Sequence, residues 1–171
     1  MAREQNHRLK LEDFGPFVIF TALYAAGTLG LPEIHLFAYQ VKVGEIPSAF
    51  VAIFGYPAVF GLTLGQFIAN LGVEASPIAM LSPAVSFIGL VVIYRLRKVS
   101  VLAGCVAYII LTSTWLTYLL PITSGISTST AASSAFLGQT IAVLIGYGGY
   151  AVASRIRTSV AATPEGQQTT Q

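Results

Sequence analysis

Two side-chain amides lie inside a long apolar run and could bind a polar ligand. Gln66 and Asn70 are four residues apart in GLTLGQFIANL (61–71), so both lie on one side of a helix. Each amide offers hydrogen-bond donors and acceptors, which suits a planar ligand with a purine-like edge. The alternative role for each amide is a hydrogen bond to a neighbouring helix of its own bundle. Gly61 and Gly65 would let helices or ligand approach this segment closely.

A second polar group occurs in YQVKVGEIPSAF (39–50), which contains Gln40, Lys42 and Glu45. An acid in the first turn of the helix expected here is favoured by the helix N-terminus. These residues predict a clamp for a polar ligand at the outer face of a membrane. A solvated lip with one weak ion pair is the alternative.

Further along the chain, Trp115 could stack on a planar ligand. Gln139 could join Gln66 and Asn70 in a cavity or form a hydrogen bond within its own bundle. An aromatic belt at the membrane surface is the other explanation for Trp115 and Tyr118.

The sequence contains no motif for binding a metal or hydrolysing ATP. The one cysteine and the two histidines do not have the spacing of metal ligands, and no GxxxxGK[ST] loop occurs. We therefore expect no enzyme activity, no metal and no cofactor in this chain.

The composition indicates an integral membrane protein. Hydrophobic residues make up 54% of the 171 residues and charged residues 9%, whereas soluble domains carry about 25% charged residues. Mean hydropathy is +0.73. The polar start of the chain does not resemble a cleavable signal peptide.

The apolar segments predict an all-α bundle of six transmembrane helices. The spans are 14–31, 44–56, 57–71, 77–94, 99–120 and 136–154. The second and third spans share one apolar run, which a turn at Gly55-Tyr56-Pro57 would divide. A single longer, tilted helix is the competing interpretation.

Charge placement favours six spans over five. With a cytoplasmic N-terminus, every basic residue except Lys42 falls on the cytoplasmic side: Arg3, Arg8, Lys10, Arg95, Arg97, Lys98, Arg155 and Arg157. We expect a cytoplasmic segment at 1–13, one membrane domain at 14–157 and a disordered cytoplasmic tail at 158–171. The Ser/Thr-rich stretch 122–135 predicts a mobile external loop.

Small residues suggest two close contacts. Ala22, Ala26 and Gly30 form a ladder in the first span, which predicts either internal packing or a docking stripe for another membrane subunit. IGYGGY (145–150) faintly resembles a potassium-channel filter, but we interpret it as close glycine packing in the sixth span.

Several phrases of the chain resemble the QueT family of queuosine-precursor transporters. They are TALYAAGT, QVKVGEIPSAFVAIFGYPAVFGLTLGQFIANL and LSPAVSFIGLVVIYRLRK, which together cover about 20–98. Members of that family are the substrate-binding S components of energy-coupling factor (ECF) transporters. The second half of the chain matches only in its helix layout.

The resemblance implies a multi-pass protein of the cell membrane that captures a 7-deazaguanine outside. It implies a transmembrane coupling subunit that docks on Ala22 and Ala26, and two ATPase subunits that use the ATP. Glu45, Gln66 and Asn70 would then bind the base. Lys42 stands where family members often carry arginine, and lysine lacks the planar fork of arginine. An S component for a vitamin and a non-transporting membrane scaffold therefore stay open.

Overall fold

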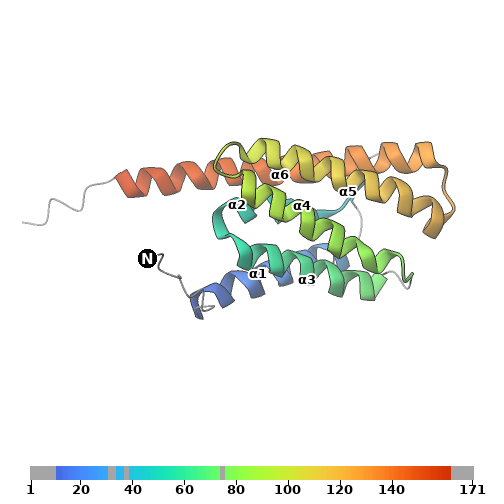
Figure 1. Ribbon diagram of the computed structural model, residues 1–171, viewed down its shortest axis with the longest axis horizontal. Helices are drawn as coiled ribbons and strands as arrows, with labels where there is room; N and C mark the ends of the chain where they lie inside the picture. The colour runs from blue at the N-terminus through green and yellow to red at the C-terminus, as the bar shows by residue number, and fades with distance from the viewer. Residues whose placement is uncertain (1–10, 31–33, 37–38, 74–75, 163–171) are drawn as a thin grey trace, which may run out of the picture.

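The computed structural model describes residues 11–30, 34–36, 39–73 and 76–162, so the expected termini at 1–10 and 163–171 lie outside the described residues. The helices run along one long axis (Figure 1). The elements in chain order are α1 (Leu11–Leu29), β1 (Ile34–Leu36), β2 (Tyr39–Val41), η1 (Val43–Phe50, a 3-10 helix), α2 (Val51–Phe54), α3 (Tyr56–Val73), η2 (Ala79–Leu81, a 3-10 turn), α4 (Ser82–Leu96), α5 (Val101–Ser124) and α6 (Thr128–Ala162). Five of the six predicted spans each correspond to one α-helix, whereas the second, 44–56, consists of the 3-10 helix η1 followed by the four-residue helix α2. The helical fold class is confirmed.

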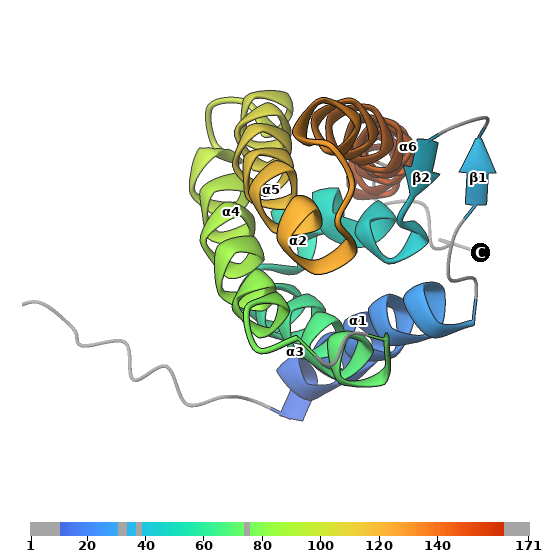
Figure 2. The same cartoon turned by 90° about the vertical axis from the view of Figure 1, so that its right-hand side faces the viewer.

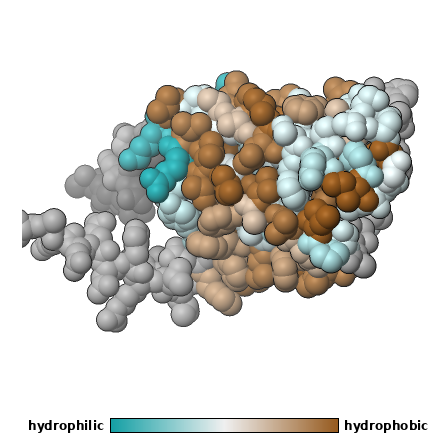
Figure 3. Space-filling model, turned by 45° about the vertical axis from the view of Figure 1, so that its right-hand side comes forward, coloured by the Kyte–Doolittle hydropathy of each residue, from teal (hydrophilic) through white to brown (hydrophobic). Residues whose placement is uncertain are grey.

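Three helical segments are long and apolar enough to cross a membrane among the residues described: Ala79–Leu96, Val101–Ser124 and Thr128–Ser159. Large apolar side chains also cover much of the outer surface, including Leu71 and Ile88 at 60% and 56% exposure. Figure 3 shows apolar side chains across the middle of one face. Such a surface is far more apolar than a soluble monomer leaves in water, so it indicates a membrane protein.

The break predicted between the second and third spans is present. Gly55 ends α2 with a φ of 71°, a left-handed conformation that glycine adopts without steric cost. Pro57 follows in the first turn of α3, where its missing N–H costs nothing. The competing single helix over this run is therefore wrong.

Three local expectations are corrected. α5 continues to Ser124 and α6 begins at Thr128, so the segment 122–135 is mostly helical and only 125–127 connect the two helices. α6 also continues through 158–162, where a disordered tail was expected. Buried Ala131 and Ala135 show why the Ser/Thr-rich stretch is helical: its small residues pack inward. In addition, β1 and β2 form an antiparallel hairpin that the all-α expectation lacked.

Glycines decide how closely α3 lies against α1. A Cβ placed on Gly61 would come 2.5 Å from the carbonyl oxygen of Phe17, and one on Gly65 would come 2.6 Å from that of Thr21. Side chains at these positions would push the two helices apart. The predicted role of the two glycines in close approach is confirmed for a helix neighbour.

Seen along the long axis, the short segment η1–α2 lies between α6 and the pair α1–α3, while α4 and α5 complete the ring (Figure 2). η1 accordingly contacts α1, α3, α5 and α6. Side chains of η1 are thereby brought to the interior of the bundle.

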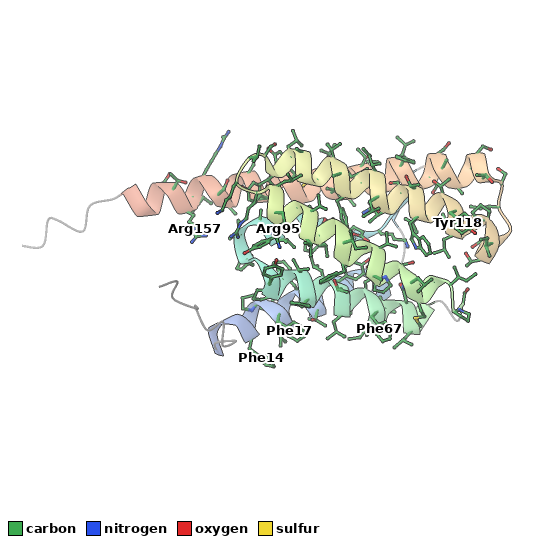
Figure 4. The ribbon with its side chains drawn as sticks, in the orientation of Figure 1. Phe14, Phe17, Phe67, Arg95, Tyr118 and Arg157 are labelled. Carbon is green, nitrogen blue, oxygen red and sulfur yellow. The ribbon has the colours of Figure 1, made fainter. Side chains whose placement is uncertain are left out.

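Basic side chains gather at one end of the bundle. Arg95 and Arg157 lie at the end opposite Tyr118 (Figure 4). Near the same end the guanidinium of Arg97 lies 4.0 Å from the centre of the Tyr94 ring and donates a hydrogen bond to the carbonyl oxygen of Ala52. This placement agrees with the expectation from the sequence that nearly all basic residues lie on one side of the membrane.

Candidate functional site

Glu45 is the carboxylate at the centre of the bundle. It is 3% exposed and lies on η1. The Tyr24 hydroxyl of α1 donates to Oε1 at 2.7 Å, and the Tyr108 hydroxyl of α5 donates to Oε2 at 2.5 Å. The expectation of a solvated lip with a Lys42–Glu45 ion pair is therefore wrong, because tyrosines engage both carboxylate oxygens inside the protein.

Close backbone contacts hold η1 in this interior position. On one side, a Cβ on Gly27 of α1 would lie 3.2 Å from the backbone nitrogen of Gly44. On the other side, Gly146 of α6 abuts the carbonyl group of Ile46 with no room for a side chain. Gly146 belongs to IGYGGY, which lies within the continuous helix α6, so this segment is a packing surface and not a filter loop.

The Glu45 cluster, meaning Glu45 with Tyr24 and Tyr108, has unused binding capacity. A carboxylate that receives two O–H donors acts as an acceptor, and it can accept about four hydrogen bonds in all. Among the residues that the structure describes, two acceptor positions are therefore left for another donor. Burying a carboxylate is costly unless it is paired, and such groups inside membrane bundles usually serve a function.

Tyr24 and Tyr108 were missed by the sequence reasoning. A signal was present, because tyrosine prefers the membrane surface and both residues lie well inside apolar spans. A buried tyrosine hydroxyl usually has a hydrogen-bond partner. What the sequence lacked was any indication that the partner of both hydroxyls is Glu45.

The two amides of α3 have different surroundings. Gln66 is 6% exposed, and its Oε1 has no hydrogen-bond partner among the residues described. Asn70 instead donates from Nδ2 to the carbonyl oxygen of Ala79 at 3.0 Å, which ties α3 to η2. On the predicted ligand face, Gln66 is thus a buried amide whose oxygen could accept a hydrogen bond from a ligand, whereas Asn70 bonds a neighbouring segment of the protein.

Replacing Asn70 by alanine is expected to lower the thermal stability without changing ligand affinity. The substitution removes the hydrogen bond between α3 and η2, so the Ala79 carbonyl oxygen keeps only its bond from the Ser82 backbone N–H, and the loss costs about 1 kcal/mol. The apparent Tm of the purified protein and a ligand titration measure the two effects. Weakened ligand binding at an unchanged Tm would contradict this prediction and would show that Asn70 contributes to ligand binding.

Lys42 and Gln139 come together from distant parts of the sequence. They line a cavity of about 20 Å³, together with Leu116, Leu120, Ser134 and Ala135. Gln139 is 4% exposed, and the structure as described offers no hydrogen-bond partner to its Nε2. Gln139 thus lines a small cavity at the N-terminal end of η1, together with Lys42 and not with the predicted partners Gln66 and Asn70.

Trp115 and Gln40 are the remaining candidates. The Trp115 indole N–H donates to the Ser82 hydroxyl at 2.8 Å, which joins α5 to α4, and Trp115 does not line the Lys42–Gln139 cavity. Gln40 lies in β2 opposite His35, and its side chain falls outside the described part of the structure. The structure therefore does not assemble all seven predicted ligand residues around one cavity.

The small-residue ladder of α1 faces outward. Ala22, Ala26 and Gly30 are all exposed, so the alternative of internal packing is wrong for this stripe. The exposed Ile19 and Leu23 share its face of the helix, because they follow the same helical spacing.

Comparison of the chain with protein-family models, with curated proteins and with solved structures finds no match.

Proposed function

We propose that this protein is the substrate-binding membrane subunit, or S component, of an ECF-type importer. On this proposal all six helical segments lie in the cell membrane, with both termini in the cytoplasm. The subunit captures a 7-deazaguanine from outside and delivers it together with a coupling subunit and two ATPases. The chain itself carries no catalytic residue and no cofactor.

The observation that carries the proposal is the buried Glu45 cluster. An acceptor group inside an apolar bundle suits a ligand with several N–H donors on one edge, and a 7-deazaguanine presents such a guanidine-like edge. Gln66 adds an interior amide whose oxygen lacks a partner among the residues described. Two donors from tyrosine hold the carboxylate in position before the ligand arrives.

The outer face of α1 supports the coupling part of the proposal. Beside the exposed stripe, α1 and the η1–α2 segment enclose an apolar groove of about 320 Å³, lined by residues that include Ile19, Leu23, Phe50 and Phe54. Small residues next to an apolar groove allow the backbone of a second membrane helix to come close. An apolar helix of the coupling subunit is the proposed occupant.

Ligand-induced thermal stabilisation tests the proposal. The purified protein would be heated with several 7-deazaguanines, guanine and common vitamins, because a ligand at 100 times its Kd adds about 2.7 kcal/mol of stability. A shift with 7-deazaguanines alone is the expected result. A shift with a vitamin alone would keep the S-component role and change the substrate. No shift with any compound would contradict the proposal.

Replacing Ala26 by tryptophan is expected to abolish assembly with the coupling subunit and to leave ligand binding intact. The bulky ring would occupy the exposed stripe without entering the bundle. Leu144→Trp provides the control, because Leu144 is also exposed, at 48%, but lies on α6. Co-purification of the subunits measures assembly. Equal assembly of both variants would show that the coupling subunit binds elsewhere.

Two observations favour a second candidate, a membrane scaffold. The Asn70 amide bonds its own bundle, and the cavity beside Lys42 has room for about one water molecule. A scaffold would show no stabilisation with any compound of the panel, while Ala26→Trp would still disrupt assembly. The two experiments together therefore separate the candidates.

A further inference from the structure

The Lys42–Gln139 cavity is lined by two residues whose side chains carry hydrogen-bond donors. The Lys42 ammonium group is a donor only, and the Gln139 amide can direct an N–H into the cavity. Gln139 is more than nine-tenths buried, and its Nε2 lacks a partner among the described residues. A buried amide without a partner is costly, so a group that is absent from the protein itself is expected to satisfy it.

The position of the cavity relative to Glu45 is set by two elements. Lys42 is the residue that precedes η1, and Glu45 lies three residues later, about 6 Å along a 3-10 helix. Gln139 and Gly146 are seven residues apart on one side of α6, and Gly146 is in contact with Ile46. Lys42 is thus about one helical turn from Glu45 along η1, and Gln139 is about two turns, or about 10 Å, from the Gly146–Ile46 contact along α6.

The size of the cavity restricts what it can hold. About 20 Å³ is enough for one water molecule or one oxygen atom of a ligand, but not for a ring. Leu116, Leu120 and Ala135 form the apolar part of its wall. An acceptor oxygen would satisfy Lys42 and Gln139 together.

We infer that the Lys42–Gln139 cavity is an oxygen subsite, which holds one water molecule in the empty protein and takes a carbonyl or carboxylate oxygen of the substrate on loading. The inference rests on the proposed function and narrows the substrate class. The substrate must carry an acceptor oxygen next to the N–H edge that Glu45 binds. A base that has the N–H edge but lacks the acceptor oxygen would leave Lys42 and Gln139 without a ligand acceptor, so these donors would stay unpaired or bound to water.

Matched ligands test the subsite. 7-Deazaguanine carries a ring carbonyl oxygen, and 2-amino-7-deazapurine is the same base without it. We expect the wild-type protein to bind the first about 10- to 100-fold more tightly, as for a hydrogen bond to a charged group. Gln139→Leu and Lys42→Met are each expected to reduce this ratio to about threefold or less.

The control is Ser133→Ala. Ser133 precedes the cavity residue Ser134, but its exposed hydroxyl donates to the Ser129 carbonyl oxygen, so the variant should keep the wild-type ratio. Removing the carbonyl also changes the neighbouring ring nitrogen. For this reason the test depends on how far Gln139→Leu and Lys42→Met reduce the ratio of the two affinities, and not on the wild-type ratio alone.

Each result distinguishes the subsite from the proposed function. If the wild-type protein binds both bases and the ratio persists in both variants, the subsite is overturned and the function stands. If it binds neither base, the proposed function is wrong. The apparent Tm of the ligand-free Gln139→Leu variant then tests whether the cavity holds a water molecule. A lower Tm supports a water-holding cavity, and a higher Tm overturns it. If Gln139→Leu does not fold, Lys42→Met decides by the same measurements.

Discussion

Replacing Glu45 by glutamine is expected to weaken ligand binding by about 100-fold while the protein stays folded. A hydrogen bond to a charged acceptor contributes more than one to a neutral acceptor, and the ligand edge is expected to donate at least two of them. Glutamine keeps the size of the side chain and one acceptor oxygen, so one of the two tyrosines retains its partner. Isothermal titration with a 7-deazaguanine measures the loss, and gel filtration reports the fold.

Tyr24→Phe provides the comparison for Glu45→Gln. It removes one of the two donors to the carboxylate but leaves the charge, so the effect on affinity should stay below about tenfold. Its main effect should be a lower apparent Tm. Unchanged affinity in Glu45→Gln would mean that the carboxylate only links η1 to α1 and α5, and the proposed binding site would then be wrong.

Replacing Gly146 by alanine is expected to destabilise the protein by about 1–3 kcal/mol or more, the range for inserting atoms into a packed core. The added methyl group would meet the backbone carbonyl of Ile46, which cannot turn away as a flexible side chain could. η1 would have to move, and with it Glu45. Ligand affinity should therefore fall together with stability, as measured by apparent Tm and titration.

Gly148→Ala is the matched control on the same helix. Gly148 is exposed, and a Cβ placed there meets no atom within 4 Å. Because alanine is the better helix former, this change should raise stability by about 0.5–1 kcal/mol. A similar loss of stability in both variants would indicate helix flexibility as the cause, and would contradict the specific contact between α6 and η1.

Much of the helix layout could be read from the sequence because it depends on local chemistry. Apolar runs of membrane length become helices wherever the backbone must satisfy its own hydrogen bonds. Gly55 and Pro57 ended one helix and began the next through their own backbone preferences. The helix ends near 125 and 160 were predicted less well, because small polar residues are compatible with either loop or helix.

The candidate site could be predicted only in part. The sequence singled out Gln66 and Gln139 as amides inside apolar spans, and Lys42 and Glu45 as part of a polar cluster at the outer face. In the structure Lys42 is half-buried and the other three are buried. It could not tell Asn70 from Gln66, since both occupy one helical face. The difference comes from the Ala79 carbonyl, which lies within reach of Asn70.

By itself the sequence determined a membrane protein of helical segments, the break at Gly55, the gathering of basic residues at one end and the small-residue face of α1. These features follow from composition and local spacing. Only the tertiary structure decided that Glu45 lies in the interior between Tyr24 and Tyr108, and that Lys42 meets Gln139. The physical reason is that glycine contacts place η1 between α1 and α6, and such contacts join residues whose distance along the chain gives no sign of their proximity.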